Sequence, residues 1–210
     1  MLRLFTITNA ILAAVVAELM VLGITAFIAN DPAMFWQYAA RYSARVSFLI
    51  IAGLLLYTTI HGLFSICNDE NKRKVLIGVI YFFCTNHIIH LIFLVVNQTL
   101  RNKVLVKPRN APGMIVYCIV FLLPLLLNRG LLRRAKQTML LVSLMLISAV
   151  FIEFYINRLL GFQLPPDPSA RWVYLLFATV LLLLVLTNLY RHIKDSVTLR
   201  LTQRSIDRVF

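Results

Sequence analysis

The chain has 210 residues, of which 60% are apolar and only 14% are charged, and its formal net charge is +13. Soluble domains carry about 25% charged residues, so this composition, with a mean hydropathy of +0.84, excludes an ordinary soluble fold. The length suits one membrane-embedded helical bundle, and the basic residues lie between apolar runs, which argues for membrane orientation and against nucleic-acid binding.

Six apolar segments approach or exceed the ~20 residues that a membrane-spanning helix needs. They occupy residues 7–29, 44–66, 75–97, 113–128, 138–157 and 170–190. The first is too long for the apolar core of a signal peptide, roughly 7–15 residues, and is interpreted as an uncleaved helix, with cleavage near Ala26 or Ala29 as the alternative. The fourth is the shortest and contains Pro124, so it is the weakest span. Residues 1–190 are therefore predicted to be an all-α, six-helix transmembrane domain.

Lys and Arg in the short loops predict the orientation of this bundle. With the N-terminus in the cytoplasm, 13 of the 21 basic residues face the cytoplasm and 8 face the outside. Both termini are then cytoplasmic, and a bacterial inner (plasma) membrane is the expected location. In the remaining segment, 191–210, Ile193, Val197 and Leu201 recur every four residues between basic side chains. This pattern predicts a basic amphipathic helix on the anionic leaflet, with a polar tail or a contact to a partner subunit as alternatives.

Ionisable side chains inside the predicted spans are the candidates for a functional site. Charges at mid-bilayer cost several kcal/mol, so those that are present usually have partners and often a function. Counted from the cytoplasmic start of each span at ~1.5 Å per residue, four of them share one layer near the middle of the membrane. The four are Glu18, His87, His90 and Glu153. His61 is a fifth candidate, roughly 10 Å closer to the cytoplasm than His87 by the same count.

The layer that contains Glu18, His87, His90 and Glu153 has three open interpretations. The imidazoles can hydrogen-bond to the glutamates or to Asn86 and hold the helices together without a cofactor. One of the histidines, which project from roughly one helix face, can be an axial ligand of haem b between the helices. The two histidines and two glutamates can also bind iron, zinc or copper. A proton relay is compatible with each interpretation.

Several pieces of the sequence between Arg45 and Tyr155 resemble the ferric-reductase-like transmembrane family, which includes the haem-binding membrane subunit of bacterial methionine sulfoxide reductase systems. In chain order the pieces are Arg45-Val-Ser-Phe48, Lys72-Arg73-Lys74 with Leu76-Ile-Gly78, Phe83-Cys-Thr-Asn-His87-Ile-Ile-His90-Leu91, Gly113-Met-Ile-Val-Tyr117 and Arg133-Arg134. The resemblance implies a b-type haem between membrane helices, with His87 or His90 as an axial ligand, and electron transfer across the bilayer.

The chain departs from that family at the second axial ligand. The family has a further histidine on the fifth helix, commonly near its cytoplasmic start, where this chain reads Ala135-Lys-Gln137-Thr-Met139. His61 could substitute only with other helix boundaries or for another haem. The resemblance thus implies an electron-transfer subunit that works beside a separate redox protein. The alternatives are a cofactor-free subunit of a larger membrane complex and, third, a small transporter or intramembrane metal-binding protein.

Overall fold

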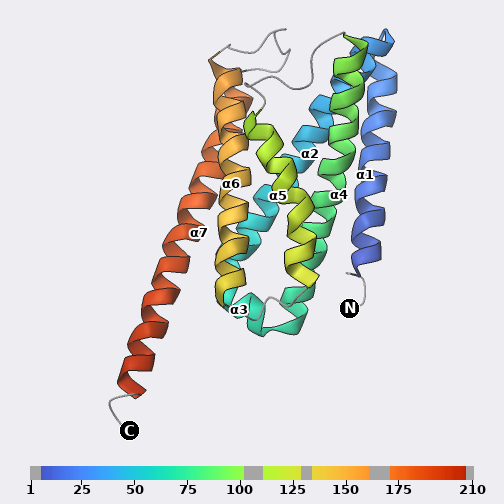
Figure 1. Ribbon diagram of the computed structural model, residues 1–210. Coiled ribbons are helices and arrows are strands. Elements are labelled where there is room, and N and C mark those ends of the chain that lie inside the picture. Colours follow the sequence, from blue (N-terminus) through green and yellow to red (C-terminus); the bar gives the residue numbers. More distant parts are fainter. Residues whose placement is uncertain (1–5, 102–110, 129–133, 161–170, 207–210) are drawn as a thin grey trace.

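The computed structural model describes residues 6–101, 111–128, 134–160 and 171–206, which form seven helices and no strand (Figure 1). The helices are α1 (Ile7–Ile28), α2 (Pro32–His61), α3 (Leu63–Asn68), α4 (Glu70–Leu100), α5 (Ala111–Asn128), α6 (Arg134–Leu159) and α7 (Arg171–Ile206). Five of them, α1, α2, α4, α6 and α7, are long and apolar enough to cross a membrane, whereas the apolar part of α5 is shorter. The chain is therefore an all-α, multi-pass membrane protein, as its composition predicts.

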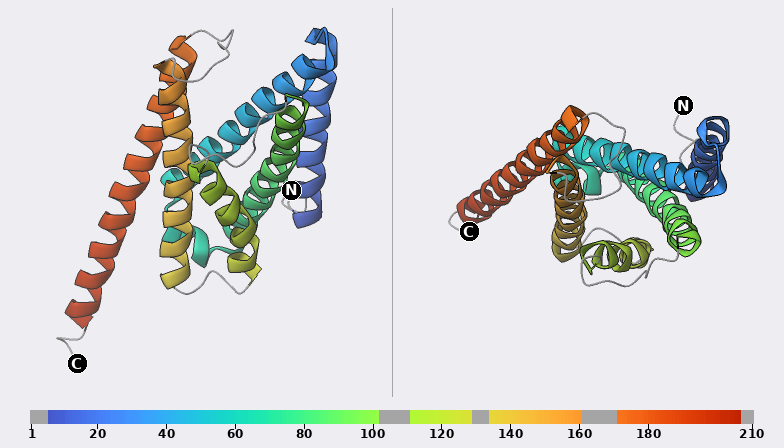
Figure 2. Two further views of the ribbon diagram at one scale, coloured as in Figure 1. Left: turned by 45° about the horizontal axis from the view of Figure 1, so that its top comes forward. Right: turned by 90° about the horizontal axis from the view of Figure 1, so that it is seen from above.

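Helices α1, α2, α4, α5, α6 and α7 alternate in direction along the chain, so the start of α1 and the end of α7 lie at the same end of the bundle (Figure 1). This arrangement agrees with the prediction that both termini share one side of the membrane; the cytoplasmic identity of that side stays a prediction. Helix α2 packs against α1, α4, α6 and α7, and α5 bridges α4 and α6 (Figure 2). Residues on α2 can therefore contact most of the other membrane helices.

Helix α2 begins well before residue 44, where the second span was predicted to start. It ends at His61, before residue 66, where that span was predicted to end. Asp31 caps the first turn by accepting a backbone hydrogen bond at 2.8 Å, and Pro32 occupies the first helical position, where its missing N–H leaves no bond unmade. Gly62, with φ of 74°, ends the helix in a conformation that favours glycine, and α3 follows. The predicted second span thus corresponds to the latter part of α2 together with the start of α3.

A polar clamp ties the end of α2 to α7. Asn188 of α7 accepts a hydrogen bond at 2.7 Å from the Thr58 hydroxyl. Arg191 donates to the carbonyl oxygens of Thr59 and Ile60, which lie in the last turn of α2 and have no intrahelical donor. The guanidinium group therefore satisfies the end of one membrane helix from the side of another.

Helix α7 continues without a break from the predicted span at 170–190 into the predicted tail at 191–210, as far as Ile206 (Figure 1). The helical conformation of that part of the tail is confirmed, but it is a straight extension of the span and not a separate segment. With 36 residues at ~1.5 Å each, α7 is about 54 Å long, against ~30 Å for the hydrocarbon core of a bilayer. Contact of the tail with the anionic leaflet stays a prediction.

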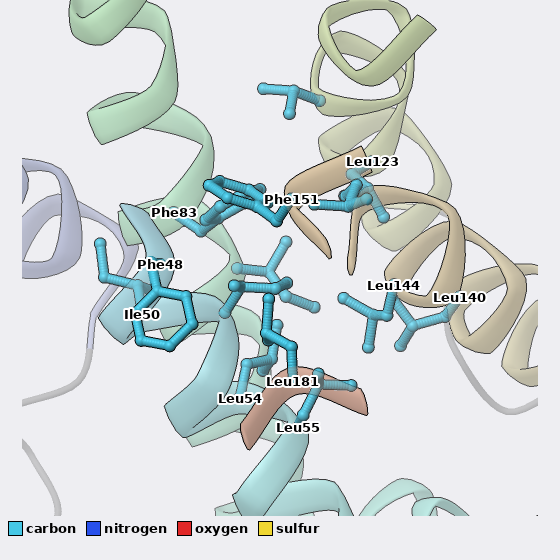
Figure 3. Packing of buried hydrophobic residues seen from close by; sticks show 14 of the residues in the cluster. Phe48, Ile50, Leu54, Leu55, Phe83, Leu123, Leu140, Leu144, Phe151 and Leu181 are labelled. Atoms are coloured by element: carbon cyan, nitrogen blue, oxygen red, sulfur yellow. The ribbon is translucent and has the colours of Figure 1, made fainter. Parts of the chain in front are cut away.

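The main apolar core lies where α2, α4, α5, α6 and α7 meet (Figure 3). Leu54, Phe83 and Leu181, from three of these helices, are completely excluded from solvent there. A smaller cluster joins α1 to α2 and α4, and consists of Val21, Ala39, Ala40 and Phe93. The outer faces of α1 and α7 carry many exposed apolar side chains, as expected for helices in contact with lipid.

Candidate functional site

A chain of hydrogen-bonded polar side chains crosses the bundle between α1, α2 and α4. Ser43 donates to Oε1 of Glu18 at 2.7 Å, and Nδ2 of Asn86 donates to the same oxygen. Ser47 donates to Oδ1 of Asn86 at 2.6 Å, and its Oγ lies 3.2 Å from Nδ1 of His87. All five side chains are buried. These hydrogen bonds connect the carboxylate of Glu18, near the middle of α1, to the imidazole of His87, near the middle of α4.

Small residues on α2 allow three helices to approach closely enough for these bonds. The buried small residues on this part of α2 are Ala39, Ala40, Ser43 and Ser47. The two serines are one helical turn apart, so both hydroxyl groups lie on one face of the helix. Small residues and serines are frequent at helix contacts in membranes because they permit close packing and interhelical hydrogen bonds.

The partners of Ser47 fix the tautomer of His87. Ser47 has one hydroxyl hydrogen, which it donates to Asn86, so its oxygen can only accept a hydrogen bond from Nδ1 of His87. Nδ1 therefore carries the imidazole proton, and Nε2 carries the lone pair. The donors follow one another from His87 through Ser47 and Asn86 to Glu18. A histidine that binds a metal is oriented in the same way, by donating its other ring N–H to a fixed acceptor.

Aromatic rings hold the imidazole of His87 in place. The ring of Phe83 stacks on it with centroids 5.3 Å apart, and Tyr117 of α5 stacks on it at 4.8 Å. Phe151 of α6 adds a tilted contact at 5.9 Å. His87 is only 6% exposed, so its surroundings contain aromatic carbon and little water. The imidazole is thus positioned by four helices, α2, α4, α5 and α6.

Two buried polar atoms near this chain have no hydrogen-bond partner among the described residues. They are Oε2 of Glu18 and Nδ1 of His90. The His90 ring lies 5.4 Å from the ring of His87 and is tilted by 35° relative to it. Buried polar atoms normally have partners, so these two atoms mark a part of the bundle where a bound ligand or water would be stabilised.

His61 lies apart from this site. It is the last residue of α2, and its ring packs edge-on against Tyr57 with centroids 4.7 Å apart. Counted along α2 from Ser47, which contacts His87, it is about 21 Å away, since 61 − 47 residues separate them. The predicted offset of roughly 10 Å was therefore too small, because it was counted from a helix with a different start.

The predicted metal set of Glu18, His87, His90 and Glu153 is not brought together. Glu153 is exposed on α6, whereas the other three side chains are buried on α1 and α4. Within the described parts of the chain, no three His, Cys, Asp or Glu side chains lie close enough to hold a metal ion. Glu153 was predicted at the same depth as the other three residues, but it lies on an exposed side of α6 and not on the side that faces them.

Arg45 lies deeper in the bundle than the sequence predicted. The second span was predicted to start at residue 44, which would place Arg45 at a membrane surface. Because α2 begins at Pro32, Arg45 lies between Ser43 and Ser47 and so at the level of the polar chain. The signal for the earlier start was present in the sequence, since Asp31 followed by proline is a typical helix N-terminus.

Comparisons of the chain with protein-family models, with curated proteins and with solved structures found no match. The resemblance to ferric-reductase-like proteins therefore stays an expectation, and the function has to be inferred from the geometry around His87.

Proposed function

We propose that the chain is an electron-transfer membrane subunit in which Nε2 of His87 is an axial ligand of haem b. The observation that supports this proposal is the directed hydrogen-bond chain from His87 to Glu18, which leaves Nε2 with its lone pair. An acceptor on the opposite ring nitrogen fixes the orientation of a ligating imidazole and makes it a stronger donor. Ser47 provides this acceptor for His87, whereas Nδ1 of His90 has no partner among the described residues. His87 is therefore the better ligand of the two.

In this proposal the haem would be held by one histidine and not by two. The rings of His87 and His90 are 5.4 Å apart on neighbouring turns of the same helix, α4, so one haem would not be held by both. His61 is about 21 Å from the level of Ser47 and cannot reach the same iron. The proposed site therefore has a single histidine ligand. A haem b held there supplies a one-electron carrier, and the chain's own residues orient the ligand and exclude water.

A proton relay along the same side chains is less well supported because of Asn86. A relay requires each group to take up and release protons, but the amide of Asn86 only donates through nitrogen and accepts through oxygen. Because Asn86 lies between Ser47 and Glu18, the series of hydrogen bonds can orient and polarise His87 without transferring a proton.

The second candidate function is a cofactor-free subunit of a larger membrane complex, in which the polar chain only fastens helices together. The observation in its favour is that Phe83 and Tyr117 already pack on the ring of His87. Interhelical hydrogen bonds contribute ~0.6 kcal/mol each on average, so the four bonds of the chain would contribute about 2 kcal/mol. That contribution is sufficient for a structural role.

Absorption spectroscopy of the protein purified from cells supplied with haem separates the two candidates. The proposed function predicts a Soret band in the wild type that is lost in His87→Ala and retained in the control variant His90→Ala. Circular dichroism on each preparation shows whether the variant has kept its helices. A wild type without a Soret band after haem addition, or equal bands in the wild type and His87→Ala, contradicts the haem proposal and leaves the cofactor-free subunit.

A further inference from the structure

Glu18 is the only ionisable residue of α1, and its side chain lies in the contact of α1 with α2 and α4 (Figure 1). The side chain is only 2% exposed. Ser43 of α2 and Asn86 of α4 both donate to Oε1. Oε2 is buried as well and has no hydrogen-bond partner in the part of the chain that the structure describes. One oxygen of the carboxyl group is therefore well satisfied, and the other is not.

The two hydrogen bonds that Glu18 accepts come from neutral side chains. The guanidinium carbon of Arg45 lies over the ring of Tyr42, 5.2 Å from its centroid, and His87 is connected to Glu18 only through Ser47 and Asn86. The titratable or charged side chains on α2 and α4 that are closest in sequence to the two donors are Arg41, Tyr42, Arg45, His87 and His90. The hydrogen bonds to Glu18 thus compensate a negative charge only in part.

A proton on the carboxyl group of Glu18 suits these surroundings better than a negative charge. An ionised carboxyl group in an apolar interior loses its hydration, and such a group usually becomes neutral by binding a proton. With the proton on Oε2, Oε1 becomes the carbonyl oxygen and keeps both of its donors. A neutral hydroxyl group without an acceptor is also far less costly to bury than a charged oxygen without a donor.

We propose that Glu18 is a proton-binding site inside the membrane bundle, with a proton on Oε2 at neutral pH. The bound proton leaves α1 with no charge from Ile7 to Ile28, which suits a helix whose other side faces lipid. The proton stays at Glu18, because the amide of Asn86 does not take it up and pass it to Ser47. The proposal does not depend on haem, and the two can succeed or fail separately.

A metal cation on Oε2 is the other way to neutralise Glu18, and the contacts argue against it. Ca²⁺ binds roughly six to eight oxygen atoms, and Mg²⁺ prefers octahedral coordination. Ser43 and Asn86 direct hydrogen atoms toward Glu18, and Oδ1 of Asn86 already accepts a hydrogen bond from Ser47. A proton requires only one lone pair of Oε2, so it is the ligand that these contacts favour.

Infrared spectroscopy in a detergent without ester groups tests this site, because a protonated carboxyl group has a C=O stretching band that a carboxylate lacks. At neutral pH the wild type should show this band, shifted to lower frequency in D₂O, and Glu18→Gln should lack it. Glu153→Gln is the matched control, which removes an exposed carboxyl group from α6 and should keep the band of Glu18. Ser43→Ala should move the band to higher frequency, because the C=O oxygen loses one of its two hydrogen bonds.

A wild type without the band at neutral pH, or an equal band in the wild type and Glu18→Gln, overturns the proposal. A band that disappears when Na⁺ or Ca²⁺ is added would mean that a metal cation replaces the proton, which also overturns it. Circular dichroism shows whether Glu18→Gln has kept its helices. If that variant does not fold, Ser43→Ala decides, since a band at unchanged frequency would contradict a protonated Glu18.

Discussion

Ser47→Ala tests the polar chain because the Ser47 hydroxyl joins its two halves. The substitution removes the 2.6 Å bond to Asn86 and leaves the Nδ1–H of His87 without its acceptor. Interhelical hydrogen bonds in membranes contribute ~0.6 kcal/mol on average and up to ~1.7 kcal/mol. The loss of two bonds is therefore expected to lower the free energy of unfolding by about 1–2 kcal/mol, reduced by a few tenths because alanine favours the helix. Ser43→Ala removes one bond, to Glu18, and should cost about half as much.

The free energy of unfolding is measured by titrating the protein in mixed micelles with sodium dodecyl sulfate and following its helicity by circular dichroism. If His87 binds haem as proposed, Ser47→Ala should also weaken haem binding by roughly 10–100-fold, since the partners of metal-ligating histidines have effects of this size. Ser43→Ala leaves His87 anchored and should keep the affinity of the wild type. A Ser47→Ala protein as stable as the wild type would refute the hydrogen-bond chain, and one with unaltered haem affinity would refute the anchoring role of Ser47.

Three other substitutions test separate parts of the structure. Gly62→Ala is expected to lower the free energy of unfolding by about 1–3 kcal/mol in the same assay, because φ of 74° is strained for alanine and the Arg191 guanidinium is 3.0 Å from the new methyl group. Gly53→Ala is the control, with no atom within 4 Å, and should be neutral or stabilising. The pKa of Asp69 is held below its ordinary value of 3.8, chiefly by a backbone hydrogen bond in the first turn of α4. The resulting stabilisation is present above the ordinary pKa and is lost as the pH falls through the lowered one, so Asp69→Asn should weaken this part of the acid dependence of unfolding. An acid titration that is identical in the variant would contradict the role of the carboxylate. Glu153→Gln should change neither the free energy of unfolding nor any haem spectrum, because Glu153 is exposed on α6. A clear loss of stability or of the haem spectrum would show that Glu153 contributes to the site.

The sequence predicts helices well where an uninterrupted apolar run is also the whole helix. The predicted 7–29 corresponds to α1 at Ile7–Ile28, because lipid contact requires apolar residues along its entire length. The prediction fails for the start of α2, whose first part contains Arg41 and Arg45 and so interrupts the apolar run. That part is helical because α1 and α4 pack on it, and such tertiary contacts are not visible in the hydropathy of a single segment.

The sequence could predict how far along its helix each candidate site residue lies, but not on which side of that helix. Depth counting placed Glu18, His87 and Glu153 in one layer, and Glu18 and His87 are indeed joined by a polar chain. Glu153 is exposed because the rotation of α6 about its axis is set by the packing of its neighbours, which the spacing of charged residues does not encode. Ser43 and Ser47 were missed since a neutral serine in an apolar helix is common and becomes significant only through its partners.

The course of α7 decides how the residues after Tyr190 are interpreted. Read as a tail, Ile193 and Val197 form the apolar side of a helix lying on a membrane surface. Read as the end of α7, the same two residues continue the exposed apolar face of that helix beyond Tyr190. No glycine or proline separates Leu186 from Val197, so the chain has no residue that would readily end the helix at the boundary. Continuation of the helix beyond Tyr190 is therefore the local preference, and it agrees with the single helix from Arg171 to Ile206.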